Sequence, residues 1–78
     1  MNKITIYTTP SCVYCKMAKE FFKKNNVEYQ ELNVVQNEQA REEMIKKSRQ
    51  LGVPVIDVNG EIFVGFDQGG LKKVLNIR

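Results

Sequence analysis

The chain opens on an alternating pattern of apolar and polar side chains. From residue 3 to residue 8, Ile4, Ile6 and Thr8 take every second position, and four of these six residues are β-branched. Alternation with a period of two in a β-branched segment is typical of a strand, because successive side chains point to opposite faces of a sheet. We therefore predict a strand at the start of the chain.

A helical pattern follows this strand. Pro10 interrupts the alternation, and Ser11 can cap a helix that begins near Cys12. The apolar residues then recur at spacings of three and four, while lysine and glutamate fill the remaining positions, as in an amphipathic helix. Asn25 and Asn26 are expected to end it. The predicted apolar face consists of Met17, Ala18, Phe21 and Phe22.

A second strand and a second helix are predicted next. The strand is expected over residues 27–35, and Asn37 can cap the helix, which stops by Gly52. The side chains predicted to face inward are Tyr29, Leu32 and Val34 in the strand, and Ala40, Met44 and Ile45 in the helix.

The last third of the chain contains a hairpin signal. Asn59 and Gly60 separate two apolar runs, residues 53–58 and 61–64, and both turn residues of such a hairpin need positive φ. Asp67 can cap a final helix whose inward residues are Leu71, Val74 and Leu75. The predicted order is β-α-β-α-β-β-α, an α/β class in which the first two strands are parallel with a right-handed crossover. Its 78 residues predict a single domain, 1–78.

Charge and composition exclude several function classes. The net charge is +3, from 12 basic and 9 acidic residues, which is too small to indicate nucleic-acid binding. Glu42 with Lys46, and Glu43 with Lys47, have the spacing that supports a solvated helix face. The chain contains no apolar run of the roughly 20 residues needed to cross a membrane, and its start lacks the pattern of a secretory signal. We expect a cytoplasmic protein.

Two cysteines carry the clearest chemical signal. Cys12 and Cys15 form a C-x-x-C motif at the predicted start of a helix, directly after a strand. Residues three apart lie on one helix face, and the unpaired N–H groups of a helix start favour an anion such as a thiolate. This arrangement predicts that Cys12 is the nucleophile and Cys15 the resolving thiol. Lys16 and Lys19 can reinforce the effect, or they are plain surface lysines.

Other uses of the cysteine pair are less well supported. A zinc site needs about four ligands, and the chain has two cysteines and no histidine, so we predict no metal site within one chain. An iron–sulfur cluster or soft metal would require Cys12 to share ligands across a dimer, and this carrier remains the alternative. A disulfide closing so short a loop removes little chain entropy. Thiol–disulfide exchange with other molecules is the preferred interpretation.

Four segments together resemble a known family. In order, they are Tyr7-Thr8, Cys12-Val13-Tyr14-Cys15-Lys16, Gly52-Val53-Pro54 and Gly65-Phe66-Asp67, and they resemble the glutaredoxin-like redoxins of the thioredoxin superfamily over essentially the whole chain. The resemblance implies a thioredoxin-like (glutaredoxin) fold, with a four-stranded mixed sheet flanked by three helices, and a protein-disulfide reductase activity. It also implies a cis peptide before Pro54 that presents the Val53 backbone to the substrate. The expected substrate-binding residues are Tyr14, Val53, Pro54, Phe66 and Asp67. Of these, Tyr14, Val53 and Phe66 would form an apolar rim around Cys12, or each would mostly serve buried packing.

The chain departs from glutathione-using members of that family. Residues 9–11 carry no charge where such enzymes commonly have a basic residue, Val13 stands where they tend to have proline, and Phe66 stands where they commonly have a small polar residue. A Gly-Phe pair at residues 65–66 is more similar to NrdH-type redoxins, which are reduced by thioredoxin reductase. We expect no bound cofactor, reducing equivalents from either thioredoxin reductase or glutathione, disulfide-containing protein substrates, and a monomer.

Overall fold

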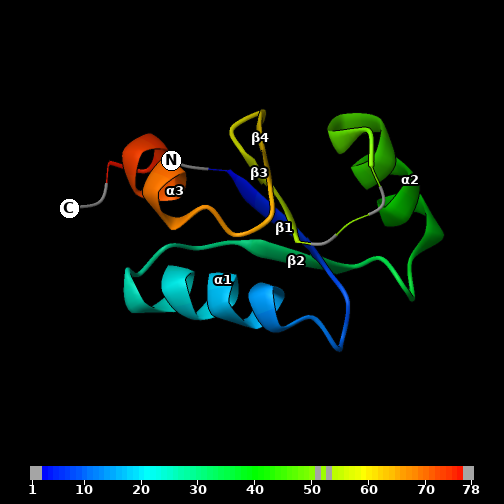
Figure 1. Ribbon diagram of the computed structural model, residues 1–78, viewed down its shortest axis with the longest axis horizontal. Helices are drawn as coiled ribbons and strands as arrows, with labels where there is room; N and C mark the ends of the chain where they lie inside the picture. Colours follow the sequence, from blue (N-terminus) through cyan, green and yellow to red (C-terminus); the bar gives the residue numbers. More distant parts are fainter. Residues whose placement is uncertain (1–2, 51, 53, 77–78) are drawn as a thin grey trace.

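The helices and strands follow the predicted order β-α-β-α-β-β-α in a computed structural model that describes residues 3–50, 52 and 54–76 (Figure 1). Their bounds are β1 Ile4–Thr8, α1 Val13–Lys24, β2 Gln30–Asn33, α2 Glu38–Ser48, β3 Val55–Val58, β4 Glu61–Val64 and α3 Gln68–Val74.

The strands form one mixed sheet in the order β2-β1-β3-β4. Strand β1 is central: Tyr7 is paired with Leu32 of the parallel strand β2 and with Val55 of the antiparallel strand β3. Strands β3 and β4 form the predicted hairpin, whose turn residues Asn59 and Gly60 have φ values of 55° and 95°. The predicted four-stranded sheet flanked by three helices is confirmed.

Helices cover both faces of the sheet, so the core has two parts. Alternate residues of β1 and β3 pack with α1 and α3 on one face, and α2 packs on the other (Figure 1). The first cluster contains Ile4, Ile6, Ala18, Phe21, Phe22, Ile56, Val58, Leu71 and Leu75. The second contains Tyr7, Val34, Ala40, Met44 and Val55. Because both faces are covered, Tyr7 is buried as fully as Ile6, which the simple alternation did not predict.

The first helix differs from its prediction in two details. Cys12, not Ser11, is the N-cap residue of α1. Met17 is 44% exposed instead of buried. The buried face of α1 consists of Cys15, Ala18, Phe21 and Phe22. Because these four side chains are buried together, Met17 lies on the solvent side of the helix. The C-terminal end is as predicted, with Asn25 as the C-cap and Asn26 at φ 56°.

The second strand is shorter than predicted. Pairing ends soon after Asn33, whose side-chain Oδ1 accepts hydrogen bonds from the N–H groups of Val35 and Gln36 at 2.9 and 3.3 Å. A local side-chain bond of this kind turns the chain and ends the ladder. Tyr29 and Val34 therefore flank the strand, although both still contact the core. The second helix is capped by Asn37 as predicted.

Candidate active site

Cys12 occupies the N-cap position of α1. Its backbone is extended, with φ −85° and ψ 113°, and its Sγ accepts a hydrogen bond from the backbone N–H of Cys15 at 3.1 Å. The N–H of Cys12 itself donates to the carbonyl of Thr9 at 3.3 Å. The sulfur thus takes the place that a serine or aspartate oxygen takes in most helix caps. Hydrogen bonds from unpaired helix N–H groups and the helix dipole both favour a negative charge at this position.

The two thiols differ in their surroundings. Both cysteines are free; Cys12 is half-buried, whereas Cys15 is only 1% exposed. Burial, and after it the hydrogen bond with Cys12, raise the pKa of the Cys15 thiol to about 12. A backbone hydrogen bond from Thr9 and the positive charge of Lys19 act in the opposite direction and lower it. The more exposed sulfur is therefore the one available to another molecule, and the buried one keeps its proton at neutral pH.

Exposed apolar side chains follow Cys12 in the first turns of α1. Val13 and Tyr14, in the first turn of α1, are 67% and 62% exposed, and Met17 extends this surface one turn further. Tyr14 is thus accessible beside Cys12, where the sequence places it. Exposed large apolar side chains next to one another on a small protein are a common sign of a contact surface.

The structure brings Pro54 to the cysteine end of the sheet. Pro54 is buried, and its carbonyl accepts a hydrogen bond from the N–H of Gly65 at 2.8 Å. Val55, next to Pro54, is paired with Tyr7 near the end of β1 that leads to the cysteines. Val53, which the sequence also assigns to the site, lies outside the described residues, and so does the peptide bond that joins it to Pro54.

Phe66 and Asp67 have structural contacts of their own. The half-buried ring of Phe66 packs edge-on against Phe21, with centroids 5.8 Å apart. Asp67 is the N-cap of α3, and its Oδ1 accepts a hydrogen bond from the N–H of Gly70 at 3.0 Å. The predicted capping role of Asp67 is confirmed, while its carboxylate is exposed and lies at the same end of the sheet as Gly65.

A group of polar side chains that the sequence did not bring together lies against α1. Thr8 is 2% exposed, and its Oγ1 donates a hydrogen bond of 2.8 Å to Oε2 of Glu31. The same oxygen accepts a hydrogen bond of 2.9 Å from Nζ of Lys19. The Lys19 ammonium holds the pKa of Glu31 below its usual range, and Glu31 in turn raises the pKa of Lys19. The spacing of Lys19, four residues after Cys15, could have indicated this group from the sequence. Nothing in the sequence around Glu31 indicated that it takes part.

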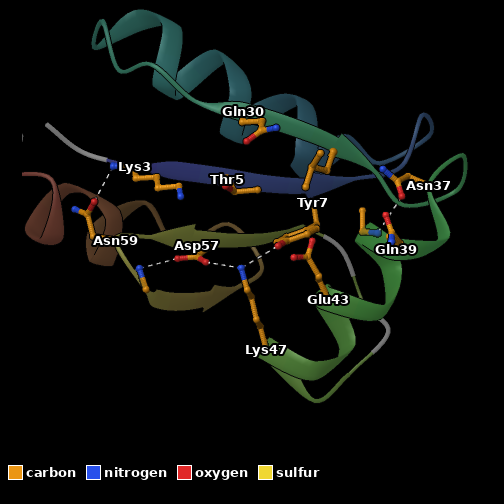
Figure 2. A pocket seen from close by; sticks show the side chains of 13 residues that line it. Lys3, Thr5, Tyr7, Gln30, Asn37, Gln39, Glu43, Lys47, Asp57 and Asn59 are labelled. Carbon is orange, nitrogen blue, oxygen red and sulfur yellow. Dashed lines mark hydrogen bonds and ion pairs between the residues drawn. The ribbon is translucent and has the colours of Figure 1, made fainter.

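An open cavity of about 480 Å³ lies on the opposite face of the sheet (Figure 2). At its base, Nζ of Lys47 donates hydrogen bonds to Oη of Tyr7 at 3.1 Å and to Oδ2 of Asp57 at 2.8 Å. The sequence predicted that Lys47 supports its own helix beside Glu43; instead it links α2 to the sheet. Because the Tyr7 side chain packs under α2 and the cysteines belong to α1, this cavity is separate from the thiols.

The described residues contain no cluster of three or more histidine, cysteine, aspartate or glutamate side chains suited to a metal ion. Among the same residues, no helix has the length and apolar character needed to span a membrane.

A sheet with this topology and a C-x-x-C pair at the start of its first helix defines a thiol–disulfide oxidoreductase of the thioredoxin-like fold. The family model described as Glutaredoxin matches residues 4–64, and the chain belongs to the glutaredoxin family. The predicted resemblance is thereby confirmed.

Known proteins are similar to this chain over nearly its full length. It is 43% identical over 72 residues to an uncharacterized glutaredoxin-like 8.6 kDa protein in the rubredoxin operon of Clostridium pasteurianum, covering 92% of this chain and 96% of that protein. It is 37% identical over 82 residues to glutaredoxin 3 of Escherichia coli K12, covering 96% and 99%. The crystal structure of the thioredoxin-like protein BC3987, mutant T8A, superposes with a TM-score of 0.92 at 36% identity and covers both chains fully.

Proposed function

We propose that this protein reduces disulfides in other proteins, with Cys12 as the nucleophile and Cys15 as the resolving thiol. The observation that carries the proposal is the position of the Cys12 sulfur: it caps α1, accepts the N–H of Cys15 and is the more exposed of the two. A thiolate is the attacking species in thiol–disulfide exchange, and a helix start favours it.

The proposed cycle has two exchange steps. The Cys12 thiolate attacks a client disulfide, forms a mixed disulfide and releases one client sulfur as a thiolate, which takes up a proton. Cys15 then loses its proton and attacks Cys12. The mixed disulfide breaks, the second client thiol leaves, and an intramolecular disulfide between Cys12 and Cys15 remains. The client gains two electrons, and the protein loses two.

A protein client is supported by the surface beside Cys12. The exposed side chains of Val13 and Tyr14 offer apolar contacts that a chain flanking a client disulfide could cover. We propose Tyr14, Val53, Pro54, Phe66 and Asp67 as the substrate-binding residues. Pro54 and Phe66 border the cysteine end of the sheet, and Asp67 presents an exposed carboxylate there.

Trapping the mixed disulfide tests the division of roles. Cys15→Ser should accumulate a covalent adduct with a protein disulfide, because no thiol remains to resolve it, whereas Cys12→Ser should form none. Non-reducing electrophoresis followed by mass spectrometry of the linked peptide identifies the attached cysteine. An adduct through Cys15 in the Cys12→Ser protein, at the rate of the unmodified protein, would overturn the assignment.

The reductant belongs to the same proposal. We propose a cytoplasmic monomer re-reduced by thioredoxin reductase, which the uncharged Thr9 and the apolar Phe66 favour over glutathione. The oxidised protein is incubated with NADPH and either thioredoxin reductase or glutathione with glutathione reductase, and free thiols are counted. If free thiols are recovered only with glutathione, the reductant is glutathione and not thioredoxin reductase. A brown, dimeric protein with visible absorbance would instead indicate the cluster-carrier alternative.

A further inference from the structure

The polar group formed by Thr8, Glu31 and Lys19 lies on the face of the sheet that α1 covers. In β1, Ile6 packs against α1, so Thr8, two residues further, points to the same face. Glu31 is paired with Ile6 in the neighbouring strand and shares that face. The carboxylate of Glu31 therefore connects β2, β1 and α1 through single hydrogen bonds of 2.8 and 2.9 Å.

Lys19 stands one helical turn after Cys15. Residues four apart on a helix have Cβ atoms about 5–6 Å from each other, on the same face. Cys15 is buried against the sheet, and the Lys19 side chain is only 27% exposed because Glu31 holds its ammonium group against β2. A charge held in a partly buried position is screened by salt less than one that moves freely in water.

The groups around the Cys15 sulfur come from three sides. Cys12 lies at the start of the helix, Lys19 lies one turn after Cys15, and the backbone of Thr9 lies just after the end of β1. Thr8, the last residue of β1, connects this end of the strand to Glu31. The carbonyl of Thr8 also accepts a hydrogen bond of 3.0 Å from the N–H of Val34, the residue that follows β2. Lys19 is the positively charged residue among these groups. Its charge lowers the pKa of Cys15, whereas burial raises that pKa.

We propose that Lys19 is a positioning residue for the resolving step, and that Glu31 and Thr8 hold its ammonium group where it favours the thiolate of Cys15. The inference rests on the proposed exchange cycle and concerns its second half. When Cys15 gives up its proton and attacks the sulfur of Cys12 in the mixed disulfide, negative charge develops on a buried sulfur. The ammonium group of Lys19, which starts one helical turn away and is held by Glu31, offsets part of the cost of placing that charge there.

The two steps can be observed separately with the symmetric aromatic disulfide of thionitrobenzoate, mixed with the reduced protein in equimolar amounts. Attack by Cys12 releases one coloured thionitrobenzoate, and attack by Cys15 releases the second. Stopped-flow absorbance between about pH 6 and pH 10, a range that includes the usual thiol pKa of about 8.5, gives a rate profile for each phase.

Lys19→Met should slow the second phase by about two- to threefold at neutral pH and leave the first phase nearly unchanged. Without the charge of Lys19 the pKa of Cys15 should rise, which lowers its thiolate fraction. A more basic thiolate is also more nucleophilic, with a Brønsted slope of about 0.4–0.5, so about half of the loss on a logarithmic scale is offset. Lys19→Arg should restore the second phase, because it keeps the charge and can still pair with Glu31. Lys24→Met, which removes an exposed lysine of the same helix, is the matched control.

Glu31→Gln tests how Lys19 is held. Its amide oxygen still accepts a hydrogen bond but no longer attracts the ammonium, so the second phase should slow less than in Lys19→Met. In a protein that already carries Lys19→Met, Glu31→Gln should cause no further slowing, because Glu31 acts through Lys19. Glu28→Gln, which removes an exposed carboxylate just before β2, is the control for charge.

The outcomes separate this inference from the proposed function. If the unmodified protein releases no thionitrobenzoate through Cys12, the exchange cycle itself fails. If both phases occur and the second has the same pH profile in Lys19→Met as in the unmodified protein, the cycle stands and the role of Lys19 is overturned. Circular dichroism of each variant, together with its unchanged first phase, excludes misfolding as the cause of a slower second phase.

Discussion

The backbone N–H of Cys15 donates its hydrogen bond to Sγ of Cys12, 3.1 Å away, so the reactive sulfur is also the cap of its own helix. Chemistry and helix stability therefore depend on the same atom. Any reaction that changes this sulfur also changes the acceptor available to the first turn of α1.

Replacing Cys12 should reveal this capping role. Cys12→Ala removes the acceptor and should lower the free energy of unfolding by about 0.5–2 kcal/mol, the usual effect of losing a cap. Cys12→Ser supplies a hydroxyl oxygen in its place and should lose less. Urea unfolding of the reduced proteins at neutral pH measures both. Equal stability of the alanine and serine variants would contradict the capping role.

The Glu31–Lys19 pair should make stability depend on pH in the acid range. The pKa of Glu31 is lowered in the folded protein, so its contribution is present above the unfolded pKa of about 4.5 and is lost as the pH falls through the lower folded value. The side chains are 39% and 27% exposed, which limits the pair to about 0.2–1 kcal/mol. Glu31→Gln should remove this part of the acid dependence in denaturant titrations, and Glu28→Gln should retain it.

Lys47 should have the opposite pH dependence. Its hydrogen bonds to Asp57 and Tyr7 raise its pKa, so the stability it contributes is present below the unfolded pKa of 10.5 and is lost as the pH rises through the folded value. Lys47→Met should lower the unfolding free energy at pH 7 by about 0.2–1 kcal/mol, because the lysine is partly exposed. Lys46→Met, its exposed neighbour, should be close to neutral. A Lys47→Met protein that loses as much stability at strongly alkaline pH as the unmodified protein would contradict this account.

The apolar surface beside Cys12 should matter for large substrates only. The double variant Val13→Thr with Tyr14→Ser should lower kcat/KM for a protein disulfide such as insulin by about three- to tenfold, since about 1 kcal/mol of apolar contact is lost. It should leave the rate with a small aliphatic disulfide nearly unchanged. Val35→Thr, at a side chain that is also 67% exposed, serves as the control. An equal loss for both substrates would assign these side chains to the chemistry and not to client binding.

Local features of this protein could be predicted from its sequence. The β1 alternation, the Asn59–Gly60 turn and the cysteine pair at a helix start each depend on neighbours within a few residues. The early end of β2 was missed because the side chain of Asn33 bonds to the backbone beyond it. The outward position of Met17 was missed because Cys15 was not included in the predicted apolar face of the helix.

Contacts between distant residues could not be predicted in the same way. Glu31 meets Lys19 and Thr8 only because the register places it beside Ile6, and no local pattern encodes that register. Lys47 has a helix partner in sequence, Glu43, but bonds to Asp57 on the sheet. The role of a polar residue whose partner lies on another helix or strand can be assigned only when the fold is known.

Tyr7 and Thr8 are adjacent in β1 but serve opposite faces of the sheet: Tyr7 contacts Lys47 beneath α2, and Thr8 contacts Glu31 beneath α1. An insertion or deletion of a single residue in β1 would exchange the two side chains and leave Glu31 without its hydroxyl partner. The exposed turn at Asn59 and Gly60 lies beyond the last paired residues of β3 and β4, so a change of length there would disturb the hydrogen bonds between Asn59 and Lys3 but would not shift β1 by one residue. Changes in chain length during evolution should therefore accumulate at that turn and be absent between Ile4 and Thr8.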